Sequence, residues 1–301
     1  MDINEALSRL DWSREPSGLY EPIAYTLAAG GKRLRPTLTL LAAQVFDGVE
    51  QKVLPAALAL EVFHNFTLLH DDVMDNAETR RGRQCVHCKW NIPTAILSGD
   101  QMLIEAYRLL QDIEPKHLPA VLRLFTRMAT EICEGQQYDM DFERRKEVTM
   151  DEYMQMIRLK TAVLFANALQ IGSLLAEAPQ NAQNALYEYG ILLGLAFQIE
   201  DDYLDCFGTP ATFGKATGGD IREGKMTWMR VTALSMGMKR PESRDVEYIL
   251  SEYRRLGVDE KAKAEVSRLT TEAINHLNHL PQNEATDRLR QLARKLVKRN
   301  I

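Results

Sequence analysis

Residues 154–171, MQMIRLKTAVLFANALQI, carry the hydrophobic pattern that decides the fold class. Apolar side chains recur in this stretch at helical spacing, at Met154, Ile157, Leu164 and Ala168. Residues three and four apart lie on one face of an α-helix, so the stretch is expected to form a helix with an apolar side. The same spacing recurs nearly throughout the chain, and the alternation typical of strands is hard to find. The pattern predicts an all-α protein.

Glycine and proline residues indicate how the chain is organised. They stand between the periodic segments, as at Pro55, Pro93, Pro115 and Pro179, and leave segments of ordinary helix length or somewhat longer. No Ser/Gly-rich or Pro-rich linker divides the chain, and no fixed short period recurs. We therefore expect one helical domain over residues 1–301.

Composition and charge exclude several classes of protein. Lys and Arg number 37 and Asp and Glu number 42, and the resulting net charge of −5 argues against nucleic acid as the main partner. No apolar run approaches the ~18 residues that span a bilayer, and the N-terminus is polar rather than an export signal. Four cysteines are too few for a disulfide framework in a chain of this length. We expect a soluble, cytoplasmic protein without integral membrane association.

Two aspartate clusters are the most informative feature of the sequence. Each has the pattern DDxxD after apolar residues: the first comprises Asp71, Asp72 and Asp75, and the second comprises Asp201, Asp202 and Asp205. On a helix, the first and last aspartates of each cluster share a face because they are four residues apart. Like charges held in this way repel each other unless a cation lies between them.

A solvated helix face would also explain one such cluster. Two copies, each after a strongly apolar run, instead favour core helices that turn their carboxylates toward a shared interior cavity. Burying this much negative charge is costly unless cations compensate it. Oxygen ligands without accompanying Cys or His select hard ions, and Mg²⁺, which keeps waters and adds substrate phosphates, fits best. The clusters therefore predict a Mg²⁺ site for a phosphate-bearing substrate.

Cationic side chains are concentrated near both clusters, as a phosphate-bearing substrate requires. They are Arg80, Arg81, Lys160, Lys215, Arg222 and Lys225. A second basic segment, GGKRLRP at 30–36, offers flexible backbone followed by three cations, a pattern suited to an anion. Such runs are usually solvated when they occur alone. We interpret this segment as an anion site only because the aspartate clusters are also present.

With these motifs the sequence resembles the trans-isoprenyl diphosphate synthases, the head-to-tail polyprenyl synthetases that include farnesyl and geranylgeranyl diphosphate synthases. The matching segments, in chain order, are GGKRLRP (30–36), HNFTLLHDDVMDNAETRRG (64–82), EGQQYD (134–139), Lys160-Thr161, FQIEDDYLD (197–205) and GKATGGDIREGK (214–225). The order and spacing of one family are reproduced at six separated places. The match is therefore highly specific.

The resemblance implies a fold, an assembly and a set of metal ligands. Proteins of this family are all-α, mostly antiparallel helical bundles around a deep central cavity, usually as homodimers. Asp71, Asp75 and Asp201 would bind Mg²⁺ directly, in a site of three ions. Asp72, Asp202 and Asp205 would complete the ion sites directly or through water.

The resemblance also implies two diphosphate sites. The diphosphate of the allylic substrate (dimethylallyl, geranyl or farnesyl) would be held by Arg80, Lys160, Gln198, Lys215 and Lys225, with Thr161 beside them. The diphosphate of isopentenyl diphosphate would be held by Gly31, Lys32, Arg35, His64 and Arg81.

These implied charges predict the chemistry of a trans-prenyltransferase. Mg²⁺ with Lys and Arg side chains would stabilise the departing diphosphate, and the double bond of isopentenyl diphosphate would attack the allylic cation. Proton loss to the released diphosphate would complete the transfer without a protein nucleophile. Thr161, Gln198 and backbone carbonyls would stabilise the cation in a dry cavity.

The helix before the first cluster is expected to limit product length. Phe66 lies five residues before Asp71, about 7.5 Å along a helix axis, whereas Thr67 lies four residues before it and nearer to the same face. An aromatic residue at the fifth position before this motif is typical of the family's short-chain members. We expect an all-trans C15 to C20 product, with C20 favoured. The alternative is that Phe66 is only a core aromatic.

Other interpretations fit less of the sequence. A class I terpene cyclase has an aspartate-rich Mg²⁺ site but needs no cradle for a second diphosphate, and a catalytically silent regulatory subunit should show an eroded motif. The segment from Cys85 to Cys88 lacks the second ligand pair of a structural zinc site. Glu61-x-x-His64 lacks the second ExxH of a di-iron site.

Two segments depart from the family pattern or extend it. Gln84 and Cys85 stand where the family usually has a proline and a small hydroxyl residue, which we interpret as local variation outside the diphosphate contacts. The basic C-terminal RKLVKRN resembles a tail that closes over the site in some members, and a solvated helix end explains it as well.

Overall fold

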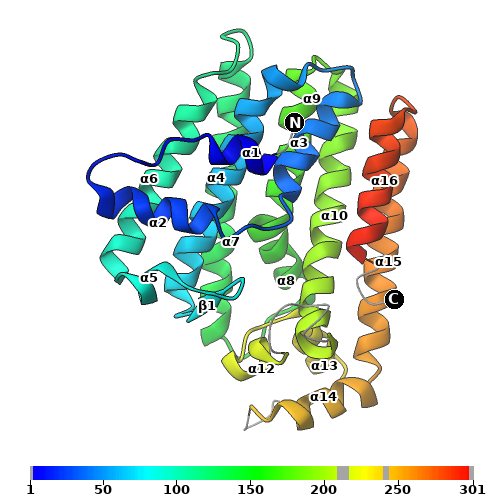
Figure 1. The fold of residues 1–301 in the computed structure, drawn as a ribbon. Coiled ribbons are helices and arrows are strands. Elements are labelled where there is room, and N and C mark those ends of the chain that lie inside the picture. Colours follow the sequence, from blue (N-terminus) through cyan, green and yellow to red (C-terminus); the bar gives the residue numbers. More distant parts are fainter. Residues whose placement is uncertain (1–2, 209–216, 240–243, 298–301) are drawn as a thin grey trace. The chain divides into compact units, whose positions relative to one another are not determined.

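The computed structural model describes residues 3–208, 217–239 and 244–297, and 76% of them are helical (Figure 1). The elements are α1 (Ile3–Ser8), α2 (Ser17–Leu27), α3 (Leu34–Gln44), α4 (Glu50–Met74), β1 (Thr79–Arg80), β2 (Arg83–Gln84), α5 (Val86–Lys89), α6 (Ile92–Leu110), α7 (Leu118–Arg144), α8 (Met150–Ile157), η1 (Arg158–Ala162), α9 (Val163–Leu175), α10 (Gln180–Phe207), α12 (Gly219–Glu223), α13 (Trp228–Ser235), α14 (Val246–Arg255), α15 (Val258–His276), η2 (Leu277–His279) and α16 (Glu284–Val297). The predicted all-α class is confirmed.

The chain packs as two compact units. Unit 1 comprises residues up to 123 together with 171–178, and unit 2 comprises 124–170 and the chain from 179 onward. Helices α7 and α9 each contribute residues to both units. Whether the two units act as the single expected domain stays a prediction.

Helix α4 is the core of unit 1, and α3 and α6 pack along it (Figure 1). Its small residues Ala56, Ala57 and Ala59 are fully buried, which allows neighbouring helices to approach closely. Near its C-terminal end, the ring of His70 occupies the space that a side chain at Gly99 of α6 would fill. This packing fixes the end of α4 that carries the first aspartate cluster.

Helix α4 is also the one described helix that is long and apolar enough, by length and composition, to cross a membrane. We expected no such segment from the sequence. However, 61% of its most apolar window is buried within the protein. A core helix of a soluble protein passes the same test, and the buried side chains of α4 identify it as a core helix.

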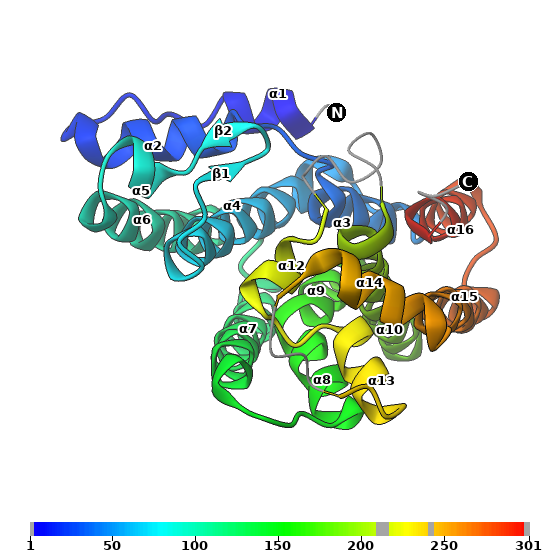
Figure 2. The same ribbon diagram turned by 90° about the horizontal axis from the view of Figure 1, so that it is seen from below.

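Unit 2 is built around α10, which packs against α15 and α13 (Figure 2). It also packs against η1. The hydroxyl of the fully buried Tyr189 in α10 donates a hydrogen bond of 2.9 Å to the carbonyl oxygen of Leu289 in α16. Gly190 and Gly194 in α10 allow the backbone of the facing segment to approach at Ala166 and Ala162, because a Cβ at either glycine would collide with it. These contacts position the segment that carries Lys160 and Thr161.

A short hairpin, β1–β2, follows the first aspartate cluster in unit 1. Its turn residues Arg81 and Gly82 both have positive φ, of 53° and 73°, as tight hairpin turns require. The hairpin is fastened to α2 because the Tyr25 hydroxyl donates to the Gln84 carbonyl oxygen at 3.0 Å and the Arg83 guanidinium lies 4.0 Å from the Tyr25 ring centroid. The hairpin thereby holds the arginine pair predicted to bind diphosphate.

Candidate active site

The first aspartate cluster lies at the C-terminal end of α4, in unit 1. Asp75 caps the helix, and its amide donates to the Asp71 carbonyl oxygen at 2.8 Å. Asp71 and Asp75 are each partly exposed, whereas Asp72 is only 6% exposed. The predicted helical spacing therefore holds, and it gives the outer pair of carboxylates access to a ligand that Asp72 lacks.

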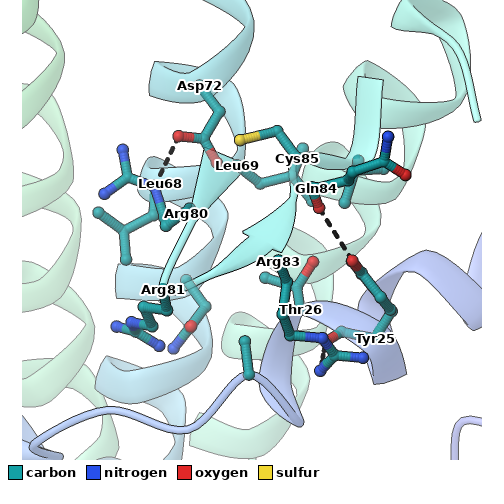
Figure 3. A pocket seen from close by; sticks show the side chains of 13 residues that line it. Tyr25, Thr26, Leu68, Leu69, Asp72, Arg80, Arg81, Arg83, Gln84 and Cys85 are labelled. Atoms are coloured by element: carbon teal, nitrogen blue, oxygen red, sulfur yellow. Dashed lines mark hydrogen bonds and ion pairs between the residues drawn. The ribbon is translucent and has the colours of Figure 1, made fainter. Parts of the chain in front are cut away.

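Asp72 instead holds Arg80 (Figure 3). The Arg80 Nε donates to Asp72 Oδ1 at 2.6 Å, while the Arg80 Nη2 lies 3.9 Å from Asp71 Oδ2. Burial, together with the nearby Asp72 carboxylate, raises the pKa of the Cys85 thiol to about 12. Cys85 is therefore a neutral, buried group in the small cavity of about 30 Å³ that these residues line. The predicted role of Asp72 as a metal ligand stays a prediction, and the structure gives it a supporting role for Arg80.

Basic side chains gather around His64, two turns before Asp71 on α4. Burial lowers the pKa of His64 well below its ordinary value, and the charges of Arg35, Arg81, Arg80 and Arg33 lower it further. Desolvation, followed by the charge of Arg33, also lowers the pKa of Arg81. Such mutual effects report a concentration of positive charge, which favours an anion. The structure thus brings together three of the residues predicted to bind isopentenyl diphosphate, namely His64, Arg35 and Arg81.

The glycine pair before α3 is shaped by Arg81. Gly31 has a φ of 136°, and a Cβ added there would lie 2.9 Å from the Arg81 guanidinium. Arg81 Nη1 donates to the carbonyl oxygen of Gly30. Lys32 is exposed beside this contact. The four predicted residues of the GGKRLRP segment and the hairpin, Gly31, Lys32, Arg35 and Arg81, therefore all belong to unit 1.

Arg33, the second of the three cations of GGKRLRP, is buried and paired within the protein. Its Nη1 pairs with Glu61 Oε1 at 2.6 Å, and its Nη2 donates to the Leu27 carbonyl oxygen at 2.7 Å. Asn65 Nδ2 completes the arrangement with a 3.1 Å bond to the same Glu61 oxygen. Sequence reasoning missed this pair, although an acidic residue inside the apolar run LALEVF was a signal for it. Glu61 is thus the buried partner of Arg33.

The second aspartate cluster lies near the C-terminal end of α10, in unit 2. Asp201 is partly exposed, while Asp202 and Asp205 are buried. Asp202 accepts bonds at both oxygens, at Oδ2 from the Tyr153 hydroxyl (2.5 Å) and the Trp228 amide (2.8 Å) and at Oδ1 from Gln198 Nε2 (3.0 Å). The predicted metal role of Asp202 stays a prediction. Its lone pairs are directed to protein donors.

Asp205 fixes the start of α12. Its Oδ1 accepts from the Gly219 amide at 3.1 Å and its Oδ2 accepts from the Asp220 amide at 3.2 Å. Burial, followed by the charge of Asp205, raises the pKa of Asp220 well above its ordinary value. The charge of Lys225 opposes this rise. Sequence reasoning missed Asp220 as part of the acidic cluster, and its signal was its place inside the matched segment 214–225.

The segment η1, which carries Lys160 and Thr161, is a single turn of π-helix. Such wide turns inside α-helices occur frequently at functional sites. The Lys160 Nζ lies 2.6 Å from Asp139 Oδ2, and the Thr161 Oγ1 donates to Gln198 Oε1 at 3.0 Å. Gly135 of α7 packs directly on the backbone at Lys160, where a Cβ would collide. Of the predicted residues in unit 2, the structure therefore brings Lys160, Thr161 and Gln198 together.

Lys215 and Lys225, which follow the second aspartate cluster, are also predicted to bind the allylic diphosphate. Lys225 Nζ lies 3.4 Å from Glu223 Oε2 and is largely buried. Lys215 lies outside the described residues, and so does the end of the basic C-terminal segment after Val297.

The carboxylates of the described residues are not arranged as a preformed metal site. Across residues 3–208, 217–239 and 244–297, no three His, Cys, Asp or Glu side chains are grouped closely enough to hold a metal ion by themselves. In unit 1 the carboxylates of Asp71 and Asp75 are partly accessible to solvent, and in unit 2 that of Asp201 is as well. Carboxylates of this kind suit Mg²⁺, which binds through one or two of them and takes its other ligands from water and substrate phosphates.

The two residues predicted to limit product length lie in the middle of α4. Phe66 is 9% exposed, and its ring centroid lies 5.4 Å from that of Phe63 and 4.8 Å from that of His70. Thr67 is partly exposed, and its Oγ1 donates to the His64 carbonyl oxygen at 2.8 Å. The role of Phe66 and Thr67 in limiting product length stays a prediction.

Comparison with known proteins identifies the family to which the chain belongs. The family model for polyprenyl synthetase matches residues 16–268. The chain belongs to the polyprenyl synthetase family. The resemblance inferred from the motifs is confirmed, and the members of this family are trans-prenyltransferases.

Named relatives are similar to this chain over most of its length. The chain is 37% identical over 307 residues to geranylgeranyl pyrophosphate synthase of Geoglobus acetivorans, covering 99% of this chain and 96% of the relative. It is 44% identical over 239 residues to geranylgeranyl diphosphate synthase of Methanosarcina mazei, covering 79% and 74%. It is also 37% identical to geranylfarnesyl diphosphate synthase of Natronomonas pharaonis, covering 99% and 95%.

Solved structures share the fold. A geranylgeranyl pyrophosphate synthase superposes with a TM-score of 0.92 at 41% identity, covering 99% of this chain and 97% of the other. A decaprenyl diphosphate synthase from Rhodobacter capsulatus superposes with a TM-score of 0.90 at 31% identity, covering 99% and 94%. Proteins named for C20 and for much longer products are thus similar to this chain in structure.

Proposed function

We propose that the protein condenses isopentenyl diphosphate with an allylic diphosphate, head to tail and with Mg²⁺, to give a short all-trans prenyl diphosphate. The observation that carries the proposal is the separation of two kinds of anion site along α4 in unit 1. Asp71 and Asp75 offer carboxylates for metal ions beside Arg80. Seven residues earlier, burial lowers the pKa of His64, and the charges of four arginines, that of Arg35 the strongest, lower it further. Two diphosphates suit these two sites, whereas a terpene cyclase binds only one.

The metal-binding part of the proposal assigns Asp71, Asp75 and Asp201 as the carboxylates that hold three Mg²⁺ ions. When bound, these ions would neutralise the charge that develops on the departing diphosphate. Asp72 supports the proposal in a different way, because it orients the Arg80 guanidinium through Nε and leaves the Nη groups for phosphate oxygens. Asp205 holds the start of the segment that carries Lys225.

The remaining residues bind and orient the two substrates. We assign Arg80, Lys160, Lys215 and Lys225 to the allylic diphosphate. We assign Lys32, Arg35, His64 and Arg81, with the backbone at Gly31, to isopentenyl diphosphate. The allylic carbon–oxygen bond breaks, the double bond of isopentenyl diphosphate forms the new carbon–carbon bond, and the released diphosphate takes the proton. The oxygens of Thr161 and Gln198 stabilise the cation between these steps.

We propose a product of C15 to C20, with C20 favoured. The buried aromatic group of Phe63, Phe66 and His70 supports this limit, because the Phe66 ring, at the fifth position before Asp71, is held in contact with the other two rings. Among the relatives, those named for geranylgeranyl products match the upper end of this range, and one named for a geranylfarnesyl product lies one isoprene unit above it.

We further propose that the protein is a cytoplasmic homodimer. Helix α6 supports self-association because it exposes four large aliphatic side chains, Ile92, Ile96, Leu97 and Ile104. All four cysteines are free, which is consistent with a reducing compartment. Light scattering coupled to size-exclusion chromatography tests the assembly, and a mass of one chain at micromolar concentration would contradict it.

Product analysis tests the proposed reaction. The protein is incubated with Mg²⁺, isopentenyl diphosphate and, in turn, dimethylallyl, geranyl or farnesyl diphosphate, and the products are identified by mass spectrometry. We expect linear prenyl diphosphates that require both substrates. A cyclic hydrocarbon made from the allylic diphosphate alone would show a terpene cyclase, and no turnover in any mixture would favour a regulatory subunit.

A further inference from the structure

Four hydrogen bonds connect a buried tyrosine to the predicted cation-stabilising residues. The Tyr153 hydroxyl donates to Asp202 Oδ2 at 2.5 Å, and the Trp228 amide donates to the same oxygen at 2.8 Å. Gln198 Nε2 donates to Asp202 Oδ1 at 3.0 Å. Thr161 Oγ1 then donates to Gln198 Oε1 at 3.0 Å. The chain of bonds joins α8, α10, α13 and η1, all within unit 2.

The direction of every bond in this chain is set by Asp202. An ionised carboxylate only accepts, so the Gln198 amide must present its NH₂ group to Asp202 and its oxygen to Thr161. The Thr161 hydroxyl therefore donates its hydrogen to Gln198, and the lone pairs of its oxygen remain directed elsewhere. With the Gln198 amide flipped, its NH₂ group would instead take up a lone pair of Thr161. The observed direction leaves both lone pairs of the Thr161 oxygen available to a carbocation, whereas the flipped amide would leave only one.

The Tyr153 hydroxyl acts as a fixed hydrogen-bond donor to the Asp202 carboxylate. It is 1% exposed, and burial followed by the charge of Asp202 raises the pKa of its phenol well above the ordinary value, so it remains a donor. Its helix is fixed at the start by a capping box, in which Thr149 Oγ1 accepts from the Glu152 amide and the Glu152 carboxylate accepts from the Thr149 amide. The Trp228 amide, in the first turn of α13, supplies the second donor.

We propose that Tyr153 is a positioning residue for prenyl transfer: through Asp202 and Gln198 it fixes the Thr161 hydroxyl in the direction that exposes its lone pairs to the allylic cation. The inference rests on the proposed function. It gives Asp202 the role of a fixed acceptor in place of a metal ligand, and it extends the reactive part of the molecule to α8, which no sequence motif marks. Because a cation exists only along the reaction path, the role concerns kcat more than substrate affinity.

A double-mutant cycle tests this coupling. Tyr153→Phe removes the donor, and Thr161→Val removes the hydroxyl at the other end of the chain while keeping its shape. We expect each single variant to lower kcat by about 10-fold or more, with the KM of both substrates little changed. We expect the double variant to be no worse than Thr161→Val alone, because Tyr153 acts through Thr161. Additive losses would overturn the proposal.

Tyr189→Phe is the matched control. Tyr189 is equally buried in unit 2 and also donates a single hydrogen bond, to the Leu289 carbonyl oxygen. Both Tyr→Phe variants should lower the thermal unfolding midpoint, but only Tyr153→Phe should lower kcat. Equal kcat values for the two variants would reduce Tyr153 to a structural residue. Should Tyr153→Phe fail to fold, Asp202→Asn takes its place in the cycle with the same expected non-additivity.

Metal binding separates the role of Asp202 from that of its neighbour. Calorimetric titration of inorganic diphosphate is performed in the presence of Mg²⁺ with the unmodified chain, Asp202→Asn and Asp201→Asn. We expect Asp202→Asn to leave the affinity close to that of the unmodified chain and Asp201→Asn to weaken it. Equal weakening by both substitutions would make Asp202 a metal ligand and overturn the positioning role. Product formation by the unmodified chain separately tests the proposed function.

Discussion

Removing the carboxylate of Glu61 should destabilise unit 1 and disturb the predicted isopentenyl diphosphate site together. The pair with Arg33 spans 2.6 Å, and the two side chains are only 2% and 7% exposed. At an effective dielectric constant of about 20 the attraction amounts to roughly 6 kcal/mol, most of which offsets the cost of removing both charges from water. Glu61→Gln leaves the Arg33 charge buried without a counter-charge, which typically costs about 3–5 kcal/mol.

The same substitution should also impair substrate binding, because Arg33 lies between Lys32 and Arg35 at the start of α3. Arg33 has a φ of 47°, and its guanidinium fixes that unusual backbone by donating to the Leu27 carbonyl oxygen. We therefore expect Glu61→Gln to raise the KM for isopentenyl diphosphate without a matching change in the KM for the allylic substrate.

Urea unfolding followed by circular dichroism measures the stability loss, and steady-state kinetics measures the two KM values. Glu114→Gln is the control, because Glu114 pairs with Lys52 at 2.5 Å on the surface and its loss should leave stability unchanged. The double variant Arg33→Met/Glu61→Met should recover most of the stability, since it removes both buried charges. Equal urea midpoints for Glu61→Gln and Glu114→Gln would refute the reasoning.

Four further predictions address the site. Asp71→Ala should lower kcat by about 100-fold or more while the protein stays folded, because a metal ligand is lost; turnover within a few-fold of the unmodified chain would remove the assignment. Lys32→Ala should chiefly raise the KM for isopentenyl diphosphate and Arg80→Ala should act through the allylic substrate; the opposite partition in steady-state kinetics would exchange the two sites. Phe66→Ala should shift the products, analysed by mass spectrometry, to longer chains, and an unchanged distribution would show a core aromatic only. The pKa of His64 is lowered in the folded protein, so below about pH 6.5 the unfolded chain binds more protons than the folded chain. The contribution of His64 to stability is therefore present above that pH and lost as the pH falls. In urea unfolding, His64→Gln should lose less stability than the unmodified chain between pH 7.5 and 5.5, and equal losses would contradict the lowered pKa.

The sequence predicted the features that depend on local spacing. Periodicity predicted the all-α class, which is confirmed, and the four-residue interval predicted that Asp71 and Asp75 lie one helical turn apart, as they do at the C-terminal end of α4. The motif order was enough to identify the family, because six segments retain it.

Features that depend on which residues meet across long intervals could not be predicted. Arg33 was one of three adjacent cations, and only its folded position beside Glu61, 28 residues away, separates it from Lys32 and Arg35. Tyr153 meets Asp202 across 49 residues, and the periodicity of its helix marks it only as a core residue. The π-helical turn at Lys160 packs closely against Gly135, a contact that leaves no pattern in the sequence of the turn itself.

Binding calorimetry with and without Mg²⁺ tests the central claim most directly, namely that one diphosphate site is built from cations alone and the other requires metal-bound carboxylates. Isopentenyl diphosphate is titrated into the protein in EDTA and in Mg²⁺, and a non-reactive thio analogue of an allylic diphosphate is titrated under the same conditions. We predict that isopentenyl diphosphate binds in EDTA, where His64 and its arginines supply the positive charge, and that the allylic analogue binds only with Mg²⁺. Binding of both ligands only with Mg²⁺, or of the allylic analogue in EDTA, would contradict the claim.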